Sequence, residues 1–167
     1  MPWKVSHFSH IEKRRVIGGF GKDLGWLGNV GASGMFRQLL AGDDRKQLRS
    51  IVRALNAASE LNPPISWKEL EGILDDLVAK GFTMKIWGRL LCLSRPDLYC
   101  TVSSNSVRSS LSDTLNLPQV AFEKSKGYTE LIRLAHHSPW FNSPSPADPD
   151  ERAIWDRRMA FMDAIFY

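Results

Sequence analysis

The chain has 167 residues and a mass of 18.9 kDa, a size that one compact domain, or one domain with an appendage, accounts for. Hydrophobic residues make up 43% and charged residues 24%, which excludes wholesale disorder, collagen-like repeats and coiled coils. The longest apolar run, 86–93, is interrupted by Gly88 and Arg89. It is far shorter than the roughly 20 residues that a membrane helix needs, so we expect no membrane association.

The amino-terminal residues and the cysteines bear on the compartment. No apolar segment follows the start Met-Pro-Trp-Lys-Val-Ser-His, so we expect a protein that is cytoplasmic or nucleoid-associated and not secreted. Cys92 and Cys100 are too few for a disulfide framework, and with the four scattered histidines they do not make a zinc-ligand set. We therefore expect neither a metal nor another cofactor.

Positive charge is concentrated early in the chain. The net charge of +4 divides into +5 over residues 1–50, zero over 51–100 and −1 over 101–167. The run Lys13-Arg14-Arg15 contributes to the early excess, and the pI is near 9.2. Such a balance permits a polyanionic partner without requiring one.

Residues 1–34 differ in composition from the rest. Phe20, Leu24, Trp26 and Leu27 lie among glycines, which disfavour regular structure. The glycines are Gly18, Gly19, Gly21, Gly25, Gly28, Gly31 and Gly34. Apolar side chains are unusual in a free linker. We predict an ordered, irregular arm over 1–34 that packs on the core or on a partner, and a helical domain over 35–167.

The domain begins with a predicted helix that follows Asp43 and Asp44, which favour the positive end of a helix, and that ends before Pro63-Pro64. Its apolar residues are Leu48, Ile51, Val52, Leu55 and Leu61.

A capping box at Ser66–Glu69, flanked by a hydrophobic staple of Ile65 and Leu70, predicts the start of the second helix, which ends at Gly81. Its predicted buried stripe is Leu70, Ile73, Leu74, Leu77 and Val78. Thr83 can cap a third helix, which must stop near Pro96. This helix is apolar on both faces and is therefore expected to be central; its residues include Ile86, Trp87, Leu90, Leu91 and Leu93.

Helical signals continue to the end of the chain. A helix with Val107, Leu111 and Leu115 is expected after the possible caps at 103–106, and another from about Tyr128. Four prolines predict a loop over 138–149. Asp148 as N-cap and Pro149 as first residue then predict one terminal helix. It would carry Ile154, Phe161, Met162, Ile165 and Phe166. No segment alternates long enough for a sheet, so the predicted fold is all-α, a compact bundle of about six or seven helices with an irregular glycine-rich N-terminal arm.

Two possible sites fail on their spacing. The segment Gly-Phe-Gly-Lys is not a phosphate-binding P-loop, because Asp23 follows Lys22 where a Ser or Thr is needed. His136 and His137 are adjacent, so on a helix they point about 100° apart and cannot chelate one ion as an i, i+4 pair would.

Residues 80–108 carry the most specific signal. A helix, a tight turn at Gly81 and a second helix from Thr83 would present unpaired helix N–H groups between lysines, an arrangement that binds phosphate. The window contains one acidic residue, Asp97. We predict nucleic-acid contacts from Lys80, Gly81, Thr83, Lys85, Arg89, Arg95 and Arg108.

The order of these elements over about residues 66–108, with a hairpin unit at 66–95, resembles the helix-hairpin-helix DNA glycosylase superfamily. Its hairpin typically reads Leu-Pro-Gly-Val-Gly-x-Lys and is followed by an apolar helix and Val-Asp-x-His-Val-Arg. Gly81 matches the first hairpin glycine, Thr83 replaces the second, and Lys85 matches the lysine that forms a Schiff base in the lyase branch. The catalytic aspartate of that family is replaced by Ser104, or by Ser103 in the alternative alignment.

Three hypotheses follow. The first is a non-catalytic DNA-associated module that binds the phosphate backbone through the hairpin turn. The second is a DNA glycosylase or abasic-site lyase in which Lys85 attacks the sugar carbon. The third is a protein-interaction subunit of a larger assembly, with the N-terminal arm or Trp140 and Phe141 as contact surface. Because the catalytic carboxylate of the resembling family is missing here, we favour the first hypothesis and expect no base excision, although Lys85 could still form a Schiff base with a pre-existing abasic site.

Overall fold

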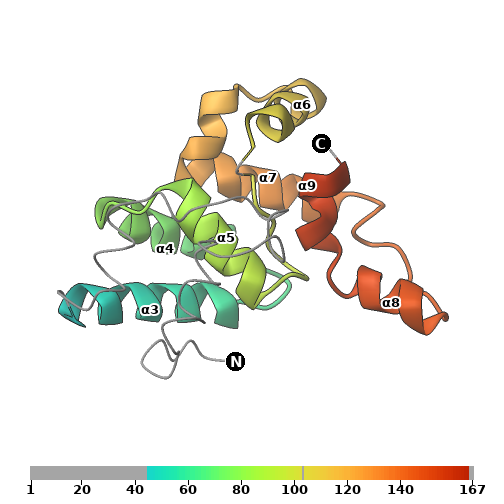
Figure 1. The fold of residues 1–167 in the computed structure, drawn as a ribbon, viewed down its shortest axis with the longest axis horizontal. Helices are drawn as coiled ribbons and strands as arrows, with labels where there is room; N and C mark the ends of the chain where they lie inside the picture. The colour runs from blue at the N-terminus through green and yellow to red at the C-terminus, as the bar shows by residue number, and fades with distance from the viewer. Residues whose placement is uncertain (1–44, 103, 166–167) are drawn as a thin grey trace, which may run out of the picture.

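A computed structural model describes residues 45–102 and 104–165, and over these residues the chain is all-helical, without a strand. Six α-helices have seven residues or more (Figure 1). The elements are α3 (Arg45–Glu60), α4 (Trp67–Ala79), α5 (Met84–Ser94), α6 (Asn105–Leu115), the 3-10 helix η3 (Gln119–Glu123), α7 (Ser125–His137), α8 (Pro149–Trp155), the 3-10 helix η4 (Arg158–Phe161) and α9 (Met162–Ile165). The all-α prediction is thus confirmed, whereas the arm at 1–34 lies outside the described residues.

Helices α3, α4 and α5 pack against one another, and α7 covers α4 from the other side (Figure 1). The link 61–66 between α3 and α4 and the turn 80–83 between α4 and α5 are both short, so each helix runs back along its predecessor. The turn at 80–83 therefore lies at the same end of the molecule as the first residues of α3 (Figure 1). The link 61–66 and the residues after α5 lie at the opposite end.

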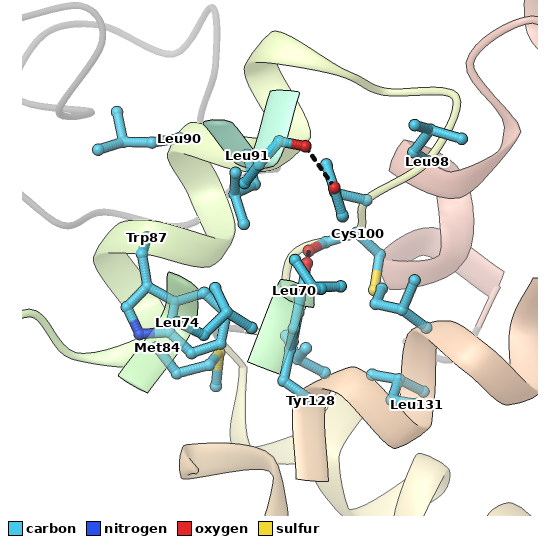
Figure 2. Packing of buried hydrophobic residues seen from close by; sticks show 14 of the residues in the cluster. Leu70, Leu74, Met84, Trp87, Leu90, Leu91, Leu98, Cys100, Tyr128 and Leu131 are labelled. Carbon is cyan, nitrogen blue, oxygen red and sulfur yellow. Dashed lines mark hydrogen bonds between the residues drawn. The ribbon is translucent and has the colours of Figure 1, made fainter. Parts of the chain in front are cut away.

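Helix α5 is central, as its apolar composition predicted. Every residue from Ile86 to Cys92 is buried. The ring of Trp87 meets the ring of Tyr128 from α7 edge to face, with centroids 4.6 Å apart. Figure 2 shows the Tyr128 hydroxyl pointing at the carbonyl of Cys100, to which it donates a 2.7 Å hydrogen bond. The buried aromatic contact thus joins α5 to α7, and the buried hydrogen bond joins α7 to the segment at residue 100.

The contact between α7 and η3 depends on Gly127. A Cβ atom at this position would lie 1.9 Å from the carbonyl oxygen of Ala121, far inside van der Waals contact. Only glycine therefore allows η3 to lie directly on the first turn of α7.

The start and stripe of α4 differ in part from prediction. Ser66 occupies the N-cap position, but its side chain makes no cap hydrogen bond, so the predicted capping box does not form. Ser66 is exposed, where water can satisfy the helix amides instead. The staple residues Ile65 and Leu70 are both buried in the core. Val78, predicted to be buried, is 43% exposed because it lies on the edge of the stripe beyond Leu74 and Leu77.

The predicted single terminal helix is wrong. Asp148 accepts hydrogen bonds from the amides of Asp150 and Glu151, as its predicted N-cap role requires, but α8 ends at Trp155. The chain then turns so that the amide of Ala160 can donate to the carbonyl of Pro96, at 3.1 Å. Met159, Ala160 and Met162 are consequently buried, whereas Ile154, Phe161 and Ile165 are exposed. Tertiary packing has overridden the helical period here. Phe166, which was also predicted to lie in this helix, is outside the described residues.

Candidate nucleic-acid interface

The turn between α4 and α5 is a Schellman motif. The amide of Gly81 donates to the carbonyl of Val78 at 2.8 Å, and the amide of Phe82 donates to the carbonyl of Leu77 at 3.1 Å. Gly81 has φ 84°, the left-handed conformation that its sequence position predicted. Phe82 and Leu77 are both buried in the core, which supplies the hydrophobic contact that accompanies this motif.

Buried and exposed residues alternate through the turn. Phe82, Met84 and Ile86 are buried, whereas Gly81, Thr83 and Lys85 are exposed. The buried residues fix the backbone to the core, and the exposed residues present the start of α5 outward.

Thr83 is the N-cap residue of α5, as predicted, but its side chain makes no cap hydrogen bond. Its carbonyl accepts hydrogen bonds from the amides of Ile86 and Trp87. Met84 and Lys85 are the first two residues of the helix, and amides at such positions have no partner within the helix. An anion placed at this end of α5 would meet these amides and the positive end of the helix dipole.

Lys80 lies on the other side of the turn, at the C-cap of α4. Its ammonium group forms an i, i+4 ion pair with Asp76, one turn back on the same helix. Such a pair on a helix surface contributes only about 0.3–0.5 kcal/mol, so a phosphate can compete with Asp76 for this cation.

Arg89, predicted to contact nucleic acid, is completely buried in α5. Burial also lowers the pKa of its guanidinium from the usual value. A side chain without exposed surface does not reach a phosphate backbone, so the prediction is wrong for this residue.

Arg95 is engaged within the fold. Its guanidinium forms a two-pronged pair with Asp97, at 2.7 Å from Nη2 and 2.9 Å from Nε. Its Nη1 also donates to the carbonyls of Ser59 and Leu61, at 2.9 and 3.2 Å. These carbonyls stand at the carboxyl end of α3, which a helix leaves without internal partners. Arg95 therefore fastens α3 to the segment after α5.

Arg108 is likewise an internal contact. Only 6% of its surface is exposed, and its guanidinium contacts Asn105 and pairs with Glu123 of η3 at 3.1 Å. The structure thus brings Lys80, Gly81, Thr83 and Lys85 together at one turn, whereas Arg89 and Arg108 are buried and Arg95 is engaged in contacts within the fold. Ser104, one of the two serines considered in place of the aspartate, is the N-cap residue of α6, and Ser103 lies outside the described residues.

Sequence reasoning missed three cations on α3. Lys46, Arg49 and Arg53 are exposed, and their spacing of three and then four residues places them on one face of the helix. The three cations are visible in the sequence, but the net charge was summed over residues 1–50 and 51–100, which separates Arg53 from Lys46 and Arg49.

A second cluster of aromatic and charged side chains lies near the far end of the α4–α5 pair. The guanidinium carbon of Arg158 lies 4.1 Å from the centroid of Phe141 and 3.8 Å from that of Trp155. His136 stacks on the other face of Phe141, with centroids 4.0 Å apart, and meets the edge of Trp67. An open cavity of about 530 Å³ adjoins this cluster. Its lining residues are Pro63, Asp97, Leu98, Phe141, Trp155, Asp156 and Arg158.

Trp140 and Phe141, which were predicted together as a contact surface, differ in their burial. Phe141 is buried within the aromatic stack, with 8% of its surface exposed, whereas Trp140 is 39% exposed. The loop folds back onto the core through Phe141, whose carbonyl accepts a hydrogen bond from Nε of Arg158.

Other chemistry is limited in the described part of the chain. No group of three or more His, Cys, Asp or Glu residues there is arranged to hold a metal ion. Cys92 and Cys100 are buried and form no disulfide. No helix among residues 45–102 and 104–165 combines the length and apolar character needed to cross a bilayer.

Comparisons of the chain with models of protein families, with curated proteins and with solved structures found no match. The geometry of the α4–α5 turn and the chemistry of its residues therefore carry the functional argument.

Proposed function

We propose that the protein is a non-catalytic DNA-associated module that binds the phosphate backbone through the α4–α5 turn. The observation that carries the proposal is the turn itself. Gly81 in the left-handed conformation turns the chain so that Thr83 and Lys85 are exposed at the start of α5, beside Lys80. Helix amides and two cations at one place are suited to a phosphate oxygen.

The resemblance to the helix-hairpin-helix DNA glycosylases supports the same partner, because Gly81 and Lys85 occupy the matching hairpin positions. The corrected set of contact residues is Lys80, Gly81, Thr83 and Lys85. Contacts of this kind read no bases, so the proposal implies binding without strong sequence preference.

The proposal excludes base excision. Glycosyl-bond cleavage in the resembling family uses a carboxylate, and a serine hydroxyl is a poor substitute for stabilising positive charge on the sugar. Lys85 is exposed at the surface and does not line the cavity beside Phe141.

The binding test compares Lys80→Glu and Lys85→Glu with Lys124→Glu and Lys126→Glu, exposed lysines at the start of α7. Each turn variant should weaken binding to all duplexes about equally. It should also flatten the slope of log affinity against log salt by about 0.9, the value of one phosphate contact. Circular dichroism verifies the fold of each variant. Unchanged binding in both turn variants would favour the protein-interaction hypothesis instead.

The catalytic alternative is tested by borohydride trapping on duplexes with a damaged base and on duplexes with a pre-formed abasic site. We expect no covalent adduct from the damaged base. A Lys85-dependent adduct from that substrate would show that another carboxylate replaces the missing one and that the protein is a glycosylase.

A further inference from the structure

Helix α3 presents a positively charged face to solvent. Lys46, Arg49 and Arg53 are all exposed, and residues 45–59 of the helix contain no carboxylate. At 1.5 Å per residue, the three cations extend over about 10 Å of the helix axis. They also lie within about 60° of one another around it, so they form a single stripe.

The stripe is placed beside the α4–α5 turn by the topology of the fold. Helix α3 packs on both α4 and α5, and its first residues lie at the same end as the turn (Figure 1). Arg95 fixes the other end of α3 by binding the carbonyls of Ser59 and Leu61. The orientation of the stripe relative to the turn is therefore set by the rigid packing of three helices.

We infer that Lys46, Arg49 and Arg53 form a second row of phosphate contacts, so that duplex DNA is bound by α3 and the α4–α5 turn together. The inference rests on the proposed function and extends its site. Phosphates follow one another every 3.4 Å along the axis of one strand, so a stripe of about 10 Å spans about three of them. The three cations are separated by about 4.5 Å and about 6 Å along α3, so their long side chains can each reach a different phosphate of one strand.

The composition of the face favours nucleic acid over an anionic membrane. A helix that lies on a bilayer needs exposed apolar side chains beside its cations. Ile51 and Leu55 of α3 point into the core. Within the described residues, the large hydrophobic side chains that are exposed belong to other elements: Val78, Val120, Trp140, Ile154, Phe161 and Ile165.

The test measures the salt dependence of duplex binding by the full chain for three variants. The first is Lys46→Gln/Arg49→Gln/Arg53→Gln, and the second is Lys80→Gln/Lys85→Gln. A matched control, Lys124→Gln/Lys126→Gln/Arg152→Gln, also removes three positive charges, but from exposed positions on other elements. The slope of log affinity against log salt should flatten by about 2.7 in the α3 variant and stay unchanged in the control.

The outcomes separate this inference from the proposed function. If the α3 variant binds like the wild type while the turn variant loses affinity, the inferred contacts from α3 are wrong and the proposed binding through the turn is supported. If only the α3 variant loses affinity, the α3 surface stands and the turn proposal fails. Binding of the wild type to anionic phosphatidylserine vesicles but not to duplex DNA would overturn both, as would equal losses in the α3 variant and the control.

Discussion

The two ends of the α4–α5 pair use their basic residues in opposite ways. At the turn, Lys85 is exposed, and Lys80 forms an ion pair with Asp76. At the far end, Arg95 makes a two-pronged pair and two hydrogen bonds to backbone carbonyls, and Arg158 lies between two aromatic rings. Lys85 is exposed at one end, and arginines join segments at the other.

The difference follows from the chemistry of the two side chains. A guanidinium is planar, is weakly hydrated and donates in a fixed fork, so it can bind several carbonyls and stack on rings in a partly buried place. An ammonium is strongly hydrated and stays near water. A count of positive charges in a sequence window therefore overestimates the charge that a partner meets, because the arginines can be used within the fold.

The largest effect on stability is expected from Arg95→Ala. The change removes the pair with Asp97 and leaves the carbonyls of Ser59 and Leu61 without their donor. Charged hydrogen bonds of this kind contribute about 1.5–3 kcal/mol, so we expect a loss of about 2–3 kcal/mol in the free energy of unfolding. Urea unfolding followed by circular dichroism measures it.

Arg95→Lys sharpens the result, because it keeps the charge but cannot reproduce the fork, and it should recover less than half of the loss. Arg53→Ala, an exposed position on α3, serves as the matched control and should change stability by no more than about 0.5 kcal/mol. Equal effects at positions 53 and 95 would contradict the structural role of Arg95.

A smaller effect is expected from Gly81→Ala at the turn. Forcing an alanine to φ 84° costs about 1–2 kcal/mol in unfolding free energy. Asparagine tolerates this conformation better, so Gly81→Asn should lose less. Gly72→Ala on α4 is the control: its added methyl group meets open space, and alanine should stabilise the helix by about 0.5–1 kcal/mol. A loss of stability at Gly72 equal to that at Gly81 would argue against the left-handed turn.

The smallest expected effect is the pH dependence of stability that arises from His136, at the far end of the α4–α5 pair. Burial, aided by the nearby charge of Arg158, lowers the pKa of His136 below its usual value of 6.5, and the hydrogen bond with the Leu98 carbonyl opposes this shift. The unfolded chain therefore binds the proton more readily, and the contribution of His136 to stability is lost as pH falls through about 6.5. Unfolding free energies at about pH 7.5 and 5.5 should fall more for the wild type than for His136→Gln. Identical slopes would show that His136 is not responsible.

Much of the fold could be predicted, because local signals and packing agree there. The period of α5, the glycine at position 81 and the N-cap at Asp148 each point to the observed element. The terminal helix was mispredicted because its break depends on contacts with Pro96 and Phe141, which are distant in sequence. Arg89 was misplaced because its charge was counted with the cations of the basic window, although it lies in the helix that was expected to be central.

The candidate site could be predicted only in its local part. Lys80, Gly81, Thr83 and Lys85 are neighbours in sequence, so their juxtaposition follows from one turn. The internal roles of Arg95 and Arg108 depend on partners in α3 and η3, which no pattern within the basic window reveals.

The difference between the exposed α4–α5 turn and the arginines that join segments of the fold is tested most directly by nuclear magnetic resonance during titration of the full chain with a short DNA duplex. The account predicts that the amide signals of Gly81, Thr83 and Lys85 shift progressively and lose their shifts at high salt, while the Nε–H signals of Arg95 and Arg158 stay in place. Shifts concentrated at the two arginines, with the turn amides unmoved, would contradict it.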